Sequence, residues 1–326
     1  MSPPSASTSD VAALVEAARD GSPRAVGRLI SIVEDASPSS REVLQVLAAY
    51  PPHAHVVGLT GPPGVGKSTT TSALAAVWRE RGLRVGILAI DPSSPFTDGA
   101  LLGDRIRMQE HALDPGVYVR SMANRGRLGG LAWSTPQALR ILDATGFDVV
   151  VIETVGVGQA EVDIASLADT TVVVLAPGLG DGIQAVKAGV LEIADLYVVN
   201  KADREGAART ARDLRQLTSM VTPHRTGDGG AEPWITPVHS IVATRGEGVA
   251  ELADDIAAHS SWLASGPEGP RRRLARTAAE IEQIALRRLR VDLAGEGGGA
   301  LAGLAADVVA GRLDPYAAAD RLVENL

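Results

Sequence analysis

The chain has 326 residues, of which 45% are apolar and 21% are charged, and its net charge at pH 7 is −8. This length predicts one large domain or two smaller ones with a real core. The negative charge argues against nucleic-acid binding driven by overall charge. The lack of cysteine excludes disulfides, thiolate metal sites and a cysteine nucleophile. No apolar run approaches the ~20 residues of a membrane span, and we expect residues 1–9 to be a disordered tail on a cytoplasmic protein.

Short helices are expected first, in an N-terminal extension over residues 10–52. Asp10 can cap the first helix, Ser22-Pro23 opens the second, and Ser37-Pro38 precedes the third. Through residues 53–263, apolar strands then alternate with helices. This alternation predicts an α/β domain, with a mostly parallel sheet covered by helices on both faces. Strands are expected at 55–60, 84–90, 148–152, 170–175, 196–199 and 235–238, and helices at about 68–81, 104–111, 134–145, 161–167, 183–193, 206–221 and 248–263.

The composition changes after Leu263. A linker rich in proline and glycine, residues 264–270, should lead to a long basic helix at 271–291. Two shorter helices are expected at about 300–311 and 315–325. The long helix carries an apolar stripe that it cannot bury alone, so residues 264–326 are expected to form an arm that docks on its own domain or on another subunit.

The clearest chemical signature lies between the first strand and the first helix of the sheet domain. The stretch Gly61-Pro62-Pro63-Gly64-Val65-Gly66-Lys67-Ser68 fits the phosphate-loop pattern of Gly, four residues, Gly-Lys-Ser/Thr. Glycines let successive N–H groups point at phosphate oxygens, and the helix start adds partial positive charge. Lys67 is expected to reach the β- and γ-phosphates and the Ser68 hydroxyl to bind Mg²⁺. Thr69 completes the expected nucleotide contacts of this segment.

Carboxylates are expected on the same edge of the sheet. Asp91 and Glu153 each follow an apolar strand, and Asp104 begins the helix after Asp91. Such carboxylates can hold Mg²⁺ directly or through water, although Asp104 also suits a helix cap. Gly156 can offer its N–H to the γ-phosphate. Small GTPases place a glutamine directly after this glycine to orient water, but this chain has Val157 there, so its hydrolysis should be organised differently.

A glycine-rich loop, residues 177–182, follows the strand at 170–175 and leads to Lys187. So many glycines suggest a loop that moves or comes close to a ligand. Lys187 can reach the phosphates when such a loop closes. A solvated helix lysine is an equally good interpretation.

The base-reading signature of GTPases follows the strand at 196–199, as Asn200-Lys201-Ala202-Asp203. The Asp203 carboxylate can accept hydrogen bonds from the guanine N1–H and N2 amine, which adenine lacks, while the Lys201 stem covers the base. Leaving this carboxylate unpaired against adenine is costly, so the motif predicts GTP rather than ATP. The last base-contacting segment is expected at His239-Ser240-Ile241.

Taken together, these motifs resemble the MeaB/ArgK/MMAA G proteins, the GTPase chaperones of adenosylcobalamin-dependent acyl-CoA mutases, chiefly methylmalonyl-CoA mutase. The resemblance covers nearly the whole chain. The strings that carry it are residues 61–68, Asp91-Pro92-Ser93-Ser94, Leu102-Gly103-Asp104, Glu153-Thr154-Val155-Gly156-Val157-Gly158-Gln159, Gly182-Ile183-Gln184-Ala185-Val186-Lys187-Ala188-Gly189 and Asn200-Lys201-Ala202-Asp203.

The resemblance implies a P-loop NTPase fold and hydrolysis of GTP to GDP and phosphate. It implies Mg²⁺ and γ-phosphate sensing by the carboxylates of Asp91, Asp104 and Glu153, and a loop at about 177–189 that contacts the mutase and brings Lys187 toward the nucleotide. It also implies that the C-terminal arm makes a homodimer. Adenosylcobalamin enters only through the partner mutase, whose loading the GTPase gates and which it protects.

Two alternatives come from other classes of GTPase. One delivers nickel or cobalt to a metalloenzyme, but those relatives typically carry Cys-x-Cys-Cys or His-rich segments, and this chain has neither. The other is a membrane-targeting factor like the signal-recognition GTPases, which needs a Met-rich or basic binding domain. The chain has only 4 methionines, which argues against this alternative. With the negative net charge, neither a nucleic-acid nor a membrane partner is expected.

Overall fold

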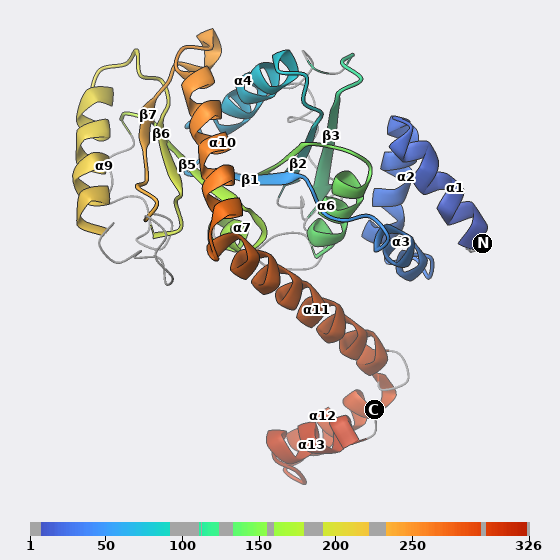
Figure 1. Cartoon of the computed structure of the whole chain (residues 1–326). Coiled ribbons are helices and arrows are strands. Elements are labelled where there is room, and N and C mark those ends of the chain that lie inside the picture. Colours follow the sequence, from blue (N-terminus) through green and yellow to red (C-terminus); the bar gives the residue numbers. More distant parts are fainter. Residues whose placement is uncertain are drawn as a thin grey trace. The chain divides into compact units, whose positions relative to one another are not determined.

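A computed structural model describes residues 8–91, 111, 113–123, 133–154, 160–178, 192–221, 233–294 and 298–324. The chain divides into two compact units, Met1–Arg273 and Leu274–Leu326. The first contains a sheet with helices on both faces, and the second is helical (Figure 1). None of the described helices is long and apolar enough to cross a membrane.

The first unit is built on a 7-stranded sheet in the order β3-β2-β4-β1-β5-β6-β7, in which all neighbouring strands pair in parallel. The strands are β1 (His55–Thr60), β2 (Val85–Asp91), β3 (Val117–Ala123), β4 (Val149–Thr154), β5 (Thr170–Leu175), β6 (Leu196–Val199) and β7 (Val238–Ser240). The central strands β1, β4 and β5 are buried along almost their whole length. The predicted parallel α/β fold is therefore confirmed.

Successive residues of a strand contribute to hydrophobic cores on opposite faces of the sheet, because side chains alternate along a strand. Val57 of β1 packs toward α4 (Lys67–Glu80) and α10 (Val249–Ser265), while Val56 packs on the other side. That other face is covered by α6 (Thr135–Ala144), α7 (Ala160–Leu167) and α9 (Ala207–Val221). Figure 1 shows these helices sandwiching the sheet.

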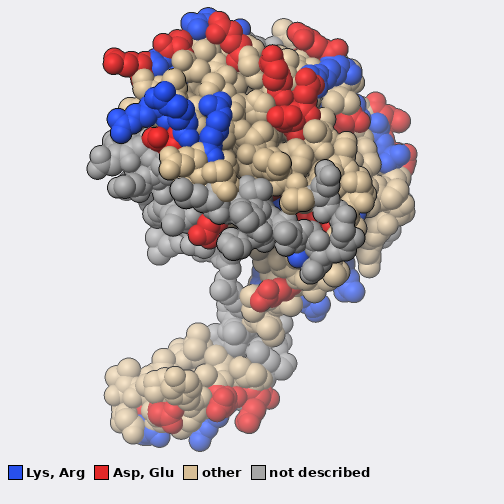
Figure 2. All heavy atoms as spheres, turned by 60° about the vertical axis from the view of Figure 1, so that its left-hand side comes forward, with Lys and Arg blue, Asp and Glu red and all other residues tan. Residues whose placement is uncertain are grey.

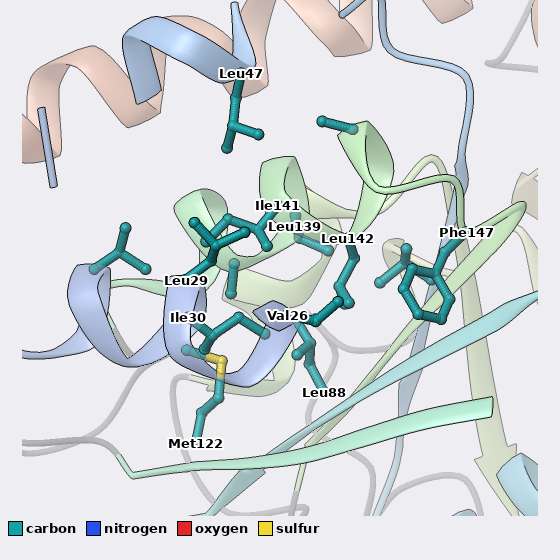
Figure 3. Close-up of a cluster of buried hydrophobic side chains, with 14 of the residues drawn as sticks. Val26, Leu29, Ile30, Leu47, Leu88, Met122, Leu139, Ile141, Leu142 and Phe147 are labelled. Carbon is teal, nitrogen blue, oxygen red and sulfur yellow. The ribbon is translucent and has the colours of Figure 1, made fainter. Parts of the chain in front are cut away.

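The N-terminal helices α1 (Thr8–Arg19), α2 (Pro23–Glu34) and α3 (Ser40–Leu47) join the same core as α6. The Ser22 side chain accepts from the amide of Ala25, the predicted cap of the second helix. In Figure 3, side chains of α2 and α3 lie against α6 and the edge of the sheet; those labelled are Val26, Leu29, Ile30, Leu47, Leu88, Met122, Leu139, Ile141, Leu142 and Phe147.

The second unit begins inside α11 (Glu268–Ala294), which is followed by α12 (Gly298–Val309) and α13 (Pro315–Glu324). The predicted linker at 264–270 is wrong in extent, because α10 continues to Ser265 and α11 starts at Glu268. Pro270 is compatible with this start, since N–H groups in the first turn of a helix have no partner within it.

β2 and β4 differ from the sequence prediction by one or two residues at their ends, so that Asp91 and Glu153 lie within the strands, and two other strands differ more. β3 was not predicted, because Arg120 and Ser121 interrupt its apolar pattern. β7 begins at Val238 rather than at 235, and Pro237 lies just before it. Proline has no N–H to donate to a ladder, so pairing through amides starts after it. The helices predicted at 104–111 and 183–193 lie almost entirely outside the described residues.

Candidate functional site

A cavity of about 480 Å³ opens at the carboxyl ends of β2, β1 and β4. This volume lies within the range of about 300–1,000 Å³ that small-molecule sites have, and the edge is where parallel sheets bind nucleotides. The residues that line the cavity are Pro63, Gly64, Gly66, Lys67, Ser68, Thr69, Ala89, Ile90, Glu153, Thr154 and Lys201. Residues of the phosphate loop, Glu153 and Lys201, all expected in the nucleotide site, thus line one cavity.

Two glycines seat the phosphate loop against neighbouring segments. Gly61 has φ +136°, and a Cβ there would lie 2.1 Å from the carbonyl oxygen of Val174 in β5. Gly66 has φ +95°, and a Cβ there would lie 2.4 Å from Nδ2 of Asn200. Any side chain would therefore push the loop away from β5 or from the segment after β6. Gly61 and Gly66 are therefore required by close packing as well as by backbone conformation.

Lys67 begins α4 and is almost fully buried, yet its charge points at the loop. Nζ donates to the carbonyl oxygens of Gly61 at 2.8 Å and Pro62 at 3.1 Å. A buried ammonium group needs such acceptors, because desolvation of an unpaired charge is expensive. The cavity thus combines a cation with the start of a helix, where N–H groups and the helix dipole favour an anion such as phosphate.

Glu153 places a buried carboxylate beside the phosphate loop, with 7% of the residue exposed. The Ser68 hydroxyl donates to Oε1, and the Thr71 hydroxyl donates to Oε2 at 3.1 Å. Thr71 was not predicted from the sequence as a site residue. The only local signal was its position one helical turn after Lys67 and Ser68, on the same face of α4.

This donor set fits Mg²⁺. A carboxylate and a hydroxyl are hard oxygen ligands, and Mg²⁺ commonly takes one or two carboxylates together with nucleotide phosphates and waters. Within the described residues no group of three or more His, Cys, Asp or Glu side chains could hold a metal by itself. With one carboxylate and one hydroxyl, Glu153 and Ser68 suit an ion that arrives with a nucleotide.

Asn200 ties the base-reading segment to the phosphate loop. Its Nδ2 donates to the carbonyl oxygen of Val65 at 2.9 Å. Its Oδ1 accepts from the amides of Lys201 at 2.7 Å and Ala243 at 3.1 Å. Lys201 has φ +58°, and its Nζ donates to the carbonyl oxygen of Gly64 at 2.6 Å. The two motifs thus form one hydrogen-bonded assembly.

Asp203 is not among the residues that line the cavity. Its carboxylate instead pairs with an arginine from another segment of the chain. Its Oδ2 lies 3.4 Å from Nη1 of Arg245, which also forms a fork on the Glu247 carboxylate. The hydrogen bond from Arg245 lowers the pKa of Glu247 below its ordinary value. Neither Arg245 nor Glu247 was predicted from the sequence as a site residue. Glu247 lies only two residues after Arg245, but the contact with Asp203 spans 42 residues of sequence.

The segment His239-Ser240-Ile241 directs two of its side chains into the protein. His239 Nε2 lies 2.8 Å from Oδ2 of Asp255 in α10. Ile241 is buried, and its carbonyl oxygen accepts from the amide of Ala202 at 3.0 Å. This segment therefore supports the base-reading loop, and its predicted contact with the base stays a prediction.

Some predicted site residues are not covered. Asp104, Gly156 and Lys187 lie outside the described residues, as does the side chain of Asp91. The backbone of Asp91 ends β2, opposite Ala123 of β3. The roles expected for these residues stay predictions.

Known proteins resemble this chain over most of its length. A protein of Pyrococcus horikoshii described as a GTPase is 44% identical over 317 residues, covering 96% of this chain and 97% of its own. The mouse protein named methylmalonic aciduria type A homolog, mitochondrial, is 36% identical over 252 residues, covering 73% of this chain and 60% of its own. A solved structure titled LAO/AO transport system kinase matches with a TM-score of 0.67 at 22% identity, covering 98% and 99% of the two chains, which shows the shared fold.

The family model described as methylmalonyl Co-A mutase-associated GTPase MeaB matches residues 26–296. This range includes the phosphate loop, Glu153 and the base-reading motif. It also extends beyond the sheet, from within α2 to two residues past the end of α11. The chain therefore belongs to the MeaB family of GTPases.

Proposed function

We propose that this GTPase gates the loading of adenosylcobalamin into an acyl-CoA mutase and protects the loaded enzyme. Methylmalonyl-CoA mutase is the expected client. The observation that carries the proposal is the match to a family described as methylmalonyl Co-A mutase-associated, over 271 residues from 26 to 296. The name of the mouse relative, which refers to methylmalonic aciduria, points to the same metabolism.

In this proposal GTP lies with its phosphates against residues 61–68. Lys67 turns from the loop carbonyls toward the β- and γ-phosphates, and the Asp203 carboxylate receives the guanine edge. Ser68 and Glu153 hold Mg²⁺, together with the carboxylates of Asp91 and Asp104. The ion neutralises charge that develops on the transferred phosphoryl group.

The parts of the proposed cycle that respond to the γ-phosphate are Gly156 and Lys187. Gly156 contributes its amide, and Lys187 approaches the phosphates when the loop that carries it closes. The same loop is proposed to contact the mutase. A client can then change hydrolysis without altering residues 61–68.

A homodimer through the second unit belongs to the same proposal. Apolar side chains that lie exposed on α11, α12 and α13 support it, because large exposed apolar surface on a soluble protein usually marks an interaction site. They are Leu274, Ile281, Leu289, Leu301, Val309, Tyr316 and Val323. On the face shown in Figure 2, acidic and basic side chains lie over the first unit among uncharged residues. Light scattering during gel filtration should give the mass of two chains.

The decisive experiment measures GTP hydrolysis by the purified protein with and without cobalamin-dependent mutases of the same organism. We expect one mutase to change the rate and to co-purify with the protein in a manner that depends on GDP or a non-hydrolysable GTP analogue. The Lys67→Ala variant is the control, since it should lose the nucleotide dependence. A hydrolysis rate that stays basal with every such mutase contradicts the proposal.

A further inference from the structure

Glu153 is held on the backbone side by two neighbouring strands. In β4 it pairs with Leu59 of β1 and with Ala89 of β2. Its Cα is therefore fixed at the carboxyl end of the central strand β4. The side chain has further torsion angles, and the last of these rotates broadly. Something other than the sheet must set the plane of the carboxylate.

Hydroxyls of α4 reach both carboxylate oxygens. Ser68 donates to Oε1, and Thr71 donates to Oε2 at 3.1 Å. One bond alone would leave the carboxylate free to turn about that contact, whereas two donors on different oxygens define its plane. The donors lie three residues apart on one helix, so they share a face and move together.

Thr71 is placed to act on Glu153 and not on a ligand. It is fully buried and is not among the residues that line the cavity. Its neighbour shows what a threonine does when it only supports its own helix, because Thr70 Oγ1 donates to the carbonyl oxygen of Gly66 at 3.0 Å, one turn back. Thr71 instead reaches across to a residue 82 positions away in the sequence.

We propose that Thr71 is a positioning residue, whose hydroxyl sets the orientation of the Glu153 carboxylate and thereby the Mg²⁺ side of the nucleotide site. The inference rests on the proposed GTP and Mg²⁺ site, but not on any mutase client. A hydrogen-bonded residue behind a metal ligand orients that ligand, and its loss typically costs about 10- to 100-fold in metal affinity or activity.

The test uses the purified full chain and a fluorescent GDP analogue, titrated with Mg²⁺ and, separately, in EDTA. Thr71→Val keeps the shape and removes the hydroxyl. We expect the Mg²⁺ concentration that half-maximally slows release of the analogue to rise by about tenfold or more. Affinity for the analogue in EDTA should stay within about twofold of the original, since the phosphate loop is intact.

Two further variants separate positioning from general damage. Thr71→Ser retains the hydroxyl and should restore the Mg²⁺ dependence. Thr145→Val is the matched control, because Thr145 is also fully buried, and its hydroxyl donates to the carbonyl oxygens of Ile141 at 2.7 Å and Leu142 at 3.1 Å, in a helix outside the cavity. It should leave the Mg²⁺ dependence unchanged. If Thr71→Val does not fold, Thr71→Ala takes its place.

The proposal also predicts non-additivity. On a Glu153→Gln background, Thr71→Val should produce no further change in Mg²⁺ dependence, because the group through which it acts is already altered. The inference is overturned if Thr71→Val behaves as the original protein does. It is equally overturned if binding in EDTA falls as much as binding in Mg²⁺, which would make Thr71 a support of the helix alone. Because no mutase is present, either result leaves the proposed client relation standing.

Discussion

The ion pair between Arg272 and Asp195 offers the sharpest stability prediction. Asp195 precedes β6 and is 1% exposed. Arg272, in the first turns of α11, donates from Nη1 to Oδ2 at 2.8 Å and from Nη2 to Oδ1 at 2.9 Å. The amide of Thr171 donates to the same carboxylate at 2.8 Å. Replacing Arg272 with leucine would leave this carboxylate buried without its cation.

The charge state of Asp195 decides the sign of the pH dependence. Burial alone would raise the pKa of Asp195, but the hydrogen bonds and charge of Arg272, with smaller help from His259, hold that pKa below its ordinary value. The pair therefore contributes stability that is complete above the unfolded-state pKa of about 3.9 and is lost as the pH falls through the lower folded-state pKa.

Removing one partner of a buried pair typically costs about 3–5 kcal/mol, because the other charge stays desolvated. The Arg272 side chain is 23% exposed, so water can partly replace it, and we expect about 3 kcal/mol for Arg272→Leu. The control is the adjacent Arg271→Leu. Arg271 pairs with Glu268 at 2.6 Å, but its side chain is 75% exposed. The Arg271→Leu substitution should therefore lower the free energy of unfolding by about 0.5 kcal/mol or less.

The assay is urea unfolding followed by tryptophan fluorescence at pH 7.5 and pH 5. Trp234 reports on this region, since its Nε1 donates to the backbone oxygen of Asp195 at 2.9 Å. In Arg272→Leu, burial without the cation raises the pKa of Asp195, so stability is lost as the pH rises through that value. The deficit should thus be larger at pH 7.5 than at pH 5. A deficit below about 1 kcal/mol, or one that does not shrink at pH 5, would refute the reasoning.

Three predictions concern the nucleotide site and can be checked by binding titrations. Lys67→Ala should weaken GTP binding on the order of 100-fold, because a charge-assisted contact to the phosphates is lost; an affinity within threefold of the original would contradict it. Asp203→Asn should reduce the preference for GTP over ATP by roughly 100-fold, because an amide cannot accept from both guanine donors; unchanged discrimination would count against that role. Asn200→Ala should weaken pyrophosphate and guanosine binding alike, about tenfold, whereas an effect on guanosine alone would exclude a shared assembly.

Local pattern was enough to predict the parts of the site that one segment defines. Residues 61–68 follow a buried strand and begin a helix, and their glycines are needed for that turn. Glu153 and Asn200 were found because each ends an apolar strand, and parallel strands bring their carboxyl ends to one edge.

Contacts between distant segments could not be predicted in this way. Thr71 meets Glu153 across 82 residues, and Arg272 meets Asp195 across 77. Threonine in a helix and arginine in a basic helix both have ordinary surface interpretations, and only the packing shows that these two are directed inward. β3 was missed for a related reason, since its polar residues make sense only once Arg120 is seen to pair with Glu34 of α2.

The phosphate loop and the base-reading segment form one rigid assembly, because their polar groups hydrogen-bond to one another. Asn200 bonds the loop at Val65, Lys201 bonds it at Gly64, and Gly66 has no room for a side chain beside Asn200. A shift of either segment would break these hydrogen bonds, so the proposed recognition of the base and binding of the phosphates would be coupled through the carbonyl groups of Gly64 and Val65. We therefore expect the proposed mutase client to act on hydrolysis through the residues that are predicted to approach the γ-phosphate from other loops, among them Lys187, and not by moving these two segments.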